Sequence, residues 1–131
     1  MTGFVQDLES LAVANRDFRR VLYTGEFCQL VVMSLPPGEA IGAERHTLDQ
    51  FFRVEEWSGV AVLDGVRTDV RGGFAVLVPA GTTHDIINTG RVPLQLNTLY
   101  APPNPRDGTV HHTRADAAAD DEHFDGRTSG S

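Results

Sequence analysis

From residue 21 onward, short apolar segments alternate with turn residues. The segments are rich in Val, Leu, Ile and Phe, and Gly, Pro, Asn or Asp separates them. Asp64-Gly65 is a two-residue hairpin signal of the type I′ class. No helical period lies between the segments, so the pattern predicts an antiparallel barrel or sandwich. The expected strands are residues 27–35, 44–55 (one bent strand or two), 59–63, 66–70, 74–78, 84–88 and 94–100.

The two ends of the chain follow other patterns. Phe4, Leu8 and Leu11 have the spacing of one short amphipathic helix, which we expect to cover a barrel end or a dimer seam. After Ala101 a proline-rich stretch is incompatible with a central strand. Residues 114–131 are acidic and rich in Ala, Gly and Ser, as in mobile, irregular tails. We therefore divide the chain into a helical extension (1–20), a barrel (21–113) and a tail (114–131).

Composition excludes several classes of protein. The net charge of −7 and the lack of a basic cluster argue against a nucleic-acid partner. All eleven positive residues are Arg, so a lysine Schiff base and a P-loop lysine are both excluded. No apolar run is long enough to span a membrane, and no signal peptide is visible. Cys28 has no second cysteine to pair with, and the lack of a disulfide favours a cytoplasmic location. We expect Cys28 to be a buried thiol.

Four polar side chains have a spacing that suits a metal site. Glu44 and His46 are two apart, so an extended strand places both on one face, and Gln50 shares that face if the strand continues. His84 follows a Pro-Ala-Gly turn at the start of another strand. Brought together, these groups offer a first coordination shell for a divalent cation. The alternative is a polar pocket without metal, whose members hydrogen-bond one another.

These residues resemble the two cupin motifs. The second motif is complete, with Gly73, Pro79, Gly81, His84 and Asn88 at the family's spacing. The first keeps the spacing but has Glu44-x-His46 and then Gln50, where most metal-binding cupins have His-x-His and then Glu. The chain is thus similar to small single-domain bacterial cupins. The resemblance implies an all-β double-stranded β-helix, the jelly-roll barrel, with one divalent metal per chain.

The ligand set leaves the identity of the metal open. Glu44, His46 and His84 are two histidines and one carboxylate, which suits non-haem Fe(II), but Mn, Zn or Ni accepts the same donors. Gln50 is a neutral oxygen donor and a weaker fourth ligand, or it hydrogen-bonds a bound water.

Residues on other strands are candidates for catalysis and substrate binding. Tyr100 is the candidate acid or hydroxyl donor, and Glu44 is the second candidate catalytic residue. Thr98 shares the strand face of Tyr100, whereas Asn97 lies on the other face, and both are candidate substrate contacts. Asn88 shares the face of His84, where it orients the ligand or closes the Asn-Thr-Gly turn.

The resemblance implies several functions that the sequence does not separate. One is an oxygenase of the dioxygenase type, or a related lyase, acting on a small organic molecule. Another is a redox-neutral isomerase, cyclase or hydrolase, and a third is a binding module without catalysis. We also expect a homodimer, because residues 1–20 and 27–35 offer apolar surface that one barrel would leave exposed.

Overall fold

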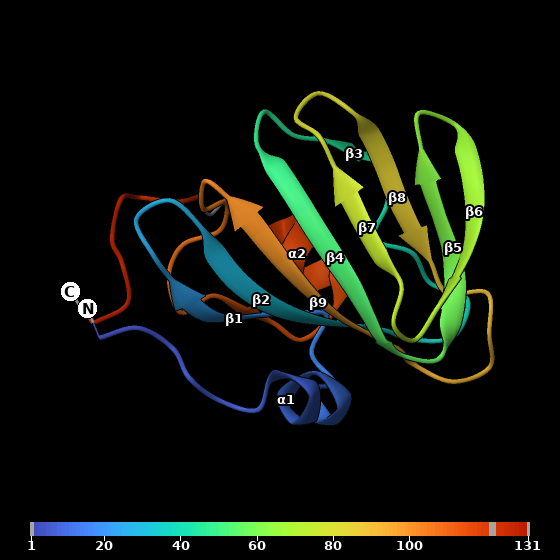
Figure 1. Cartoon of the computed structure of the whole chain (residues 1–131), viewed down its shortest axis with the longest axis horizontal. Coiled ribbons are helices and arrows are strands. Elements are labelled where there is room, and N and C mark those ends of the chain that lie inside the picture. The colour runs from blue at the N-terminus through green and yellow to red at the C-terminus, as the bar shows by residue number, and fades with distance from the viewer. Residues whose placement is uncertain (1, 121–122, 131) are drawn as a thin grey trace.

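The computed structural model describes residues 2–120 and 123–130, and it is a barrel of two facing sheets (Figure 1). The larger sheet has the strand order β10-β1-β2-β9-β4-β7, and the smaller has the order β3-β8-β5-β6. The strands are β1 (Arg19–Thr24), β2 (Gln29–Leu35), β3 (Glu44–Arg45), β4 (Asp49–Glu56), β5 (Ser58–Leu63), β6 (Val66–Arg71), β7 (Ala75–Val78), β8 (Thr83–Ile87), β9 (Leu94–Ala101) and β10 (Val110–His111). All of these strands pair antiparallel, which confirms the expected all-β jelly-roll barrel.

Side-chain alternation places the core between the sheets. Along β9, Leu94, Leu96 and Tyr100 point inward and are fully buried. They pack against Phe52 of β4 and Ile86 of β8, so both sheets contribute to one core. This is the arrangement that period-2 patterning predicts for strands buried on one face.

The turn signals predicted the hairpin correctly. Asp64 and Gly65 have φ of 47° and 82°, so both central residues take the left-handed conformation that a type I′ turn requires. The stretch expected as one bent strand or two is two strands, β3 and β4. Gln50 therefore belongs to a different strand from Glu44.

A short helix, α1 (Leu8–Ala14), lies where the N-terminal pattern predicts one. Asp7 caps its start by accepting a hydrogen bond from the Ser10 N–H at 3.1 Å. At its other end, the Gln95 amide donates to the carbonyls of Ala12 and Asn15, at 2.7 and 2.5 Å. The helix packs on β9, β2 and β4, so it covers the outer face of the larger sheet.

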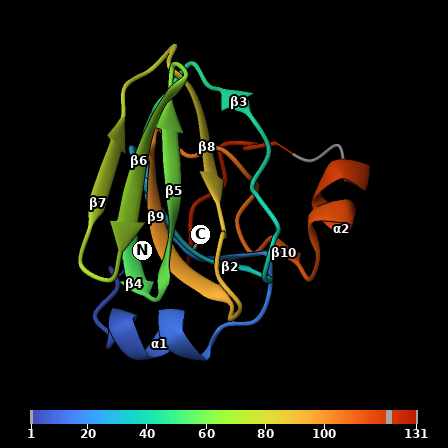
Figure 2. The ribbon, with the colours of Figure 1, turned by 90° about the vertical axis from the view of Figure 1, so that its right-hand side faces the viewer.

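Several expectations need correction. The barrel begins at Arg19 rather than at residue 21, because β1 pairs with both β2 and β10. The tail was expected to be irregular from residue 114, yet α2 (Arg114–Ala119) follows β10 beside the barrel (Figure 2). Beyond α2, the Ser129 N–H donates to the Thr24 carbonyl at 2.9 Å. Cys28 is exposed rather than buried, because it lies in the turn between β1 and β2.

Parts of the earlier expectations lie outside the described residues, namely Met1 and residues 121–122 and 131 of the extension and the tail. Within the described ranges, no helix is both long and apolar enough to cross a membrane.

Candidate metal centre

Glu44, His46 and His84 meet at one end of the smaller sheet. Glu44 and His84 are direct partners across β3 and β8, and His46 follows β3. The Glu44 Oε2 atom lies 3.1 Å from Nε2 of His46 and 3.9 Å from Nε2 of His84. One donor atom from each residue falls within 4.8 Å of the others. The sequence prediction that these three side chains converge is therefore met by the fold.

The tautomer of His84 leaves a ligand atom free. Its Nδ1 lies 3.2 Å from the carbonyl oxygen of Thr82. Only a protonated nitrogen donates to a carbonyl, so Nδ1 carries the hydrogen and Nε2 keeps its lone pair. Nε2 is buried and has no hydrogen-bond partner among the described residues. A second-sphere carbonyl of this kind is how proteins commonly orient a metal-binding histidine.

Glu44 is held in its charged form. Burial is the largest single effect and raises its pKa, but the hydrogen bond from His46 and the nearby positive charge of Arg19 act in the other direction. Together the lowering effects outweigh burial, so the pKa of Glu44 lies below its usual value. An ionised carboxylate beside two imidazoles is a donor set that suits a divalent cation.

Gln50 enters the site from the other sheet with its amide orientation defined. The Thr98 hydroxyl donates to the Phe51 carbonyl at 2.8 Å and accepts from Nε2 of Gln50 at 3.1 Å. The amide oxygen Oε1 of Gln50 is therefore the free end, buried and without a partner in the part of the chain that the structure describes. Thr98, expected as a substrate contact, instead orients Gln50.

Tyr100 lies directly opposite Gln50 on the neighbouring strand. Its ring is completely buried and meets the His46 ring edge-on, with the centroids 6.2 Å apart. Burial raises the pKa of its hydroxyl, so the group is protonated at neutral pH. Across the described residues that hydroxyl makes no hydrogen bond within normal range. The side chains of Arg19 and Asn104 also lie near that hydroxyl and lower its pKa, against the larger effect of burial. Tyr100 thus places a protonated, buried hydroxyl group beside the His46 ring.

Two of the expected substrate contacts lie elsewhere. The Asn88 amide donates to the carbonyls of Leu35 and Val92, and its oxygen accepts from the Gly90 N–H. It closes a turn, which is one of the two roles considered for it. Asn97 faces the outside of β9 and donates to Glu55 at 2.6 Å. An odd-numbered position on β9 points away from the core that receives Tyr100, so Asn97 is not brought to the centre.

Sequence reasoning missed two arginines next to this centre. A cavity of about 230 Å³ adjoins Glu44 between the barrel and α2, and Arg19 and Arg114 both line it. Arg19 lies in a short Arg-rich stretch that would be expected to be exposed to solvent, but it is only 9% exposed. Arg19 and Val21 are two positions apart, so a strand that begins at residue 19 would place Arg19 on the buried face of Val21 and Arg20 on the exposed face. This spacing was the signal that the sequence offered.

The residues present fit a divalent metal. Glu44, His46 and His84 converge, and three of the buried polar atoms that lack partners among the described residues lie around them: Nε2 of His84, Oε1 of Gln50 and the hydroxyl of Tyr100. Unpartnered buried polar atoms are costly, so several of them at one point indicate that a ligand completes the site. The Glu44–His46 hydrogen bond at 3.1 Å belongs to the alternative, metal-free network, but that network leaves these three atoms unsatisfied.

Known proteins share this fold and part of this sequence. The uncharacterized protein YrkC of Bacillus subtilis is 43% identical over 123 residues, which are 88% of this chain and 66% of YrkC. The crystal structure of a Bacillus halodurans protein has a TM-score of 0.88 at 44% identity, covering 89% of this chain and 94% of that one.

Two further matches bear on the family. Dimethylsulfoniopropionate lyase DddW of Ruegeria pomeroyi is 31% identical over 58 residues, 44% of this chain and 38% of the lyase. The family model of the cupin domain matches residues 31–100. This match covers more than half of the chain and both motifs, so the chain belongs to the cupin family.

Proposed function

We propose that the protein is a metal-dependent enzyme that acts on a small organic molecule by lyase chemistry. The observation that carries this proposal is the buried Tyr100 hydroxyl of the larger sheet, which has no hydrogen-bond partner among the described residues and lies across the core from the convergent Glu44, His46 and His84. The match to the Ruegeria lyase supports the reaction class over the part of the chain that it covers.

Each residue has a separate task. Glu44, His46 and His84 would hold the metal, and Gln50 would offer its free oxygen as a weaker fourth donor. When bound, a divalent cation supplies Lewis acidity that polarises a carbonyl or carboxyl oxygen. Tyr100 donates a hydrogen bond, or a proton, to the substrate atom that gains negative charge. Thr98 and the Thr82 carbonyl keep Gln50 and His84 in orientation.

A second candidate is an oxygenase, favoured by one observation. Two histidines and one carboxylate are the set that suits non-haem Fe(II) with open coordination positions. Turnover of a small-molecule library with zinc or manganese under nitrogen would support the lyase. Turnover that requires both iron and oxygen would support the oxygenase and overturn the lyase. Binding without turnover under either condition would leave a binding module.

The metal centre itself is tested by elemental analysis of purified variants. We expect His84→Ala to lower metal affinity by about 100-fold or more, because it removes an oriented imidazole ligand. Gln50→Ala should retain a measurable share of the metal, because water can replace a neutral amide. His123→Ala, an exposed histidine of the tail, is the matched control and should keep full occupancy. Full occupancy in His84→Ala would show that the metal binds elsewhere.

A further inference from the structure

We infer that Arg19 and Arg114 form an anion subsite, and that the substrate is a small organic molecule carrying a carboxylate. This inference rests on the proposed function for the reacting end of that molecule. The subsite is the cavity between the barrel and α2, and Glu44 lines both this cavity and the metal centre. Among the residues of the metal centre, Glu44 is the one that lines this cavity, so a ligand held there would lie beside Glu44.

Arg19 is a buried cation with spare hydrogen-bonding capacity. Its guanidinium is nine-tenths buried, and its Nε has no partner among residues 2–120 and 123–130. No ion pair within those ranges joins it to a carboxylate, although it lies close enough to stabilise the charge of Glu44. A buried guanidinium without a full complement of partners is costly unless an anion completes it.

Arg114 brings a second guanidinium to the same cavity. It is the first residue of α2, and its side chain lies so close to Gly42 that a β-carbon there would come within 2.5 Å of its terminal nitrogen. Gly42 is therefore the residue that lets the Arg114 side chain lie against the barrel wall. Among the described residues, Arg114 also forms no ion pair with a carboxylate.

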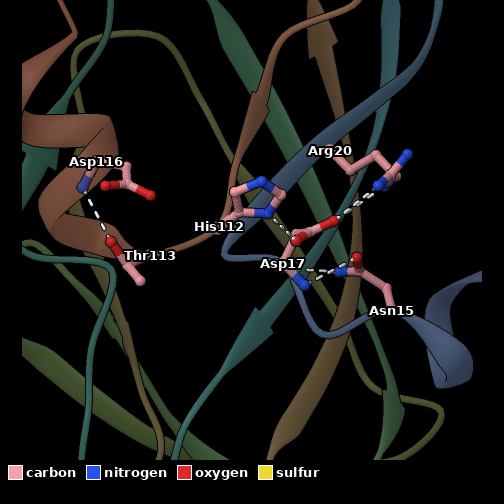
Figure 3. Close-up of polar contacts among 6 residues, drawn as sticks. All are labelled: Asn15, Asp17, Arg20, His112, Thr113 and Asp116. Atoms are coloured by element: carbon pink, nitrogen blue, oxygen red, sulfur yellow. Dashed lines mark hydrogen bonds and ion pairs between the residues drawn. The ribbon is translucent and has the colours of Figure 1, made fainter.

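Hydrogen bonds join the segments that precede β1 and α2 (Figure 3). Nδ1 of His112 lies 2.6 Å from Asp17, and the His112 carbonyl accepts from the Phe18 N–H at 3.2 Å. Thr113 then caps α2 by accepting from the Asp116 N–H at 3.0 Å. Arg19 and Arg114 each follow a joined residue by two positions, so these bonds bring together the two chain segments that carry the arginines.

Charge balance favours an anionic ligand. A divalent cation on Glu44 and two neutral imidazoles leaves the centre positively charged, since Glu44 cancels only one of its charges. Glu44 is then committed to the metal, and the Arg19 charge beside it is uncompensated. Arg114 adds a further positive charge at the cavity wall. In a chain with a net charge of −7, this local excess of positive charge is a specific attraction for a small anion.

A carboxylate fits the two guanidinium groups better than other anions do. The planar fork of arginine matches two carboxylate oxygens, and such pairs are among the strong hydrogen bonds of proteins. The cavity of about 230 Å³ also has room for several carbon atoms beyond the carboxylate. Those carbons would lie toward Glu44, which the cavity shares with the metal centre.

The test is an NMR titration of the full-length, zinc-loaded protein with propionate, with propionamide as the neutral isostere and with inorganic phosphate. We expect propionate to bind and propionamide to bind at least about 10-fold more weakly, because charge-assisted bonds are lost. Arg19→Gln and Arg114→Gln should each weaken propionate by about 10-fold and leave propionamide unchanged. Arg20→Gln is the matched control, since Arg20 is the exposed neighbour on the other face of β1.

Two results would overturn the inference. One is equal binding of propionate and propionamide, and the other is an Arg20→Gln effect as large as that of Arg19→Gln. Phosphate binding without propionate binding would assign the arginines to a phosphate instead. If Arg19→Gln does not fold, Arg114→Gln and the charge-conserving Arg19→Lys decide the question.

A repeat with metal-free protein separates this inference from the proposed function. If the protein binds no metal but still binds propionate through the two arginines, the anion subsite is supported and the proposed metal-dependent function is contradicted. If it binds metal and turns over substrate but shows no arginine-dependent binding of propionate, the proposed function is supported and the anion subsite is contradicted.

Discussion

At the scale of the residue, the centre depends on which atom of each side chain is already used. Thr82 occupies Nδ1 of His84, and Thr98 occupies Nε2 of Gln50. In both cases the opposite atom remains for a ligand. The hydroxyl of Tyr100 has no hydrogen bond of normal geometry among the described residues, although the Arg19 and Asn104 side chains lie near it.

Removing the Tyr100 hydroxyl should affect chemistry without affecting folding. We predict that Tyr100→Phe keeps its metal and its thermal midpoint, because an unpartnered buried hydroxyl contributes little net stability. Turnover should fall by about 100-fold or more if the hydroxyl acts as general acid. Steady-state kinetics with the substrate found in the screen, together with differential scanning fluorimetry, measures both effects.

Tyr23→Phe is the matched control, because Tyr23 accepts only from the Gly3 N–H, at 3.0 Å. It should leave turnover unchanged. Unchanged turnover in Tyr100→Phe would remove the tyrosine from the mechanism.

Restoring the usual cupin ligand at position 50 should change metal-bound and metal-free protein in opposite directions. In Gln50→Glu, a carboxylate oxygen would replace Nε2 and face the Thr98 oxygen, which already donates to Phe51. Without metal, the buried charge and the lost hydrogen bond should lower the thermal midpoint. With metal, the cation offsets the added charge and affinity should rise.

Calorimetric titration of zinc into wild type and Gln50→Glu measures this change. Asp49→Glu, one residue earlier on β4 and exposed, adds no charge and should leave affinity as it is. Weaker or equal affinity in Gln50→Glu would mean that this side chain does not contribute to the metal centre.

At the scale of the element, α2 is held to the barrel by hydrogen bonds at both ends. The helix is short, and none of its described residues is fully buried, although Ala117 packs against the core. Asp17 and His112 are in contact before the helix (Figure 3), and Nε2 of His111 lies 3.0 Å from Asp120 at its end.

The Asp17 carboxylate should stabilise the protein in a pH-dependent way. The His112 hydrogen bond lowers the pKa of Asp17, against the smaller effect of burial, and Arg20 adds to the lowering. A carboxyl whose pKa is lower in the folded state stabilises the fold above its unfolded pKa, which is about 3.8. That stabilisation is lost as the pH falls through the still lower folded value.

We therefore predict that Asp17→Asn lowers the thermal midpoint at pH 7, and that its difference from wild type shrinks as the pH falls below 4. Thermal unfolding from pH 7 to pH 2.5 measures the difference. Asp69→Asn, an exposed aspartate of β6, should show no such convergence. A difference that is constant with pH would assign the effect of Asp17→Asn to something other than its charge.

At the scale of the whole molecule, the barrel has two free strand edges on one side. β7 ends the larger sheet and β6 ends the smaller one, and the two lie near each other (Figure 2). Between them is an apolar groove of about 210 Å³, where Val66 and Leu77 are 67% and 64% exposed. Of the surfaces expected from the sequence to form a dimer, the outer face of β2 is covered by α1, whereas Val5 and Phe27 remain 98% and 77% exposed.

We predict a homodimer that forms through this groove, because exposed apolar edges favour association. Multi-angle light scattering should give twice the chain mass of 14.3 kDa at high concentration. Leu77→Arg should convert the dimer to monomer, whereas Phe27→Arg, at a residue 77% exposed in the β1–β2 turn, should not. A wild-type monomer at every concentration would contradict the prediction.

The sequence by itself determined the strands from β2 to β9, the Asp64-Gly65 turn and the residues that carry metal-binding chemistry, but it did not predict β1 or β10. These properties are local, because alternation, turn preference and the spacing of Glu44, His46 and His84 depend on nearby residues. The same local reasoning placed Tyr100 on an inward face of its strand. It also separated Thr98 from Asn97, although it could not say which of them had a hydrogen-bond partner.

Only the tertiary structure decided which polar atoms were left over and what lies beside the metal centre. The sequence around Arg19 predicts an exposed side chain, but in the structure α2 brings Arg114 to the same cavity. Asn97 is predicted to contact the substrate, but in the structure its amide donates a hydrogen bond to Glu55. In each case the deciding partner is distant in sequence, and no local pattern records which side chains long-range packing will bring into contact.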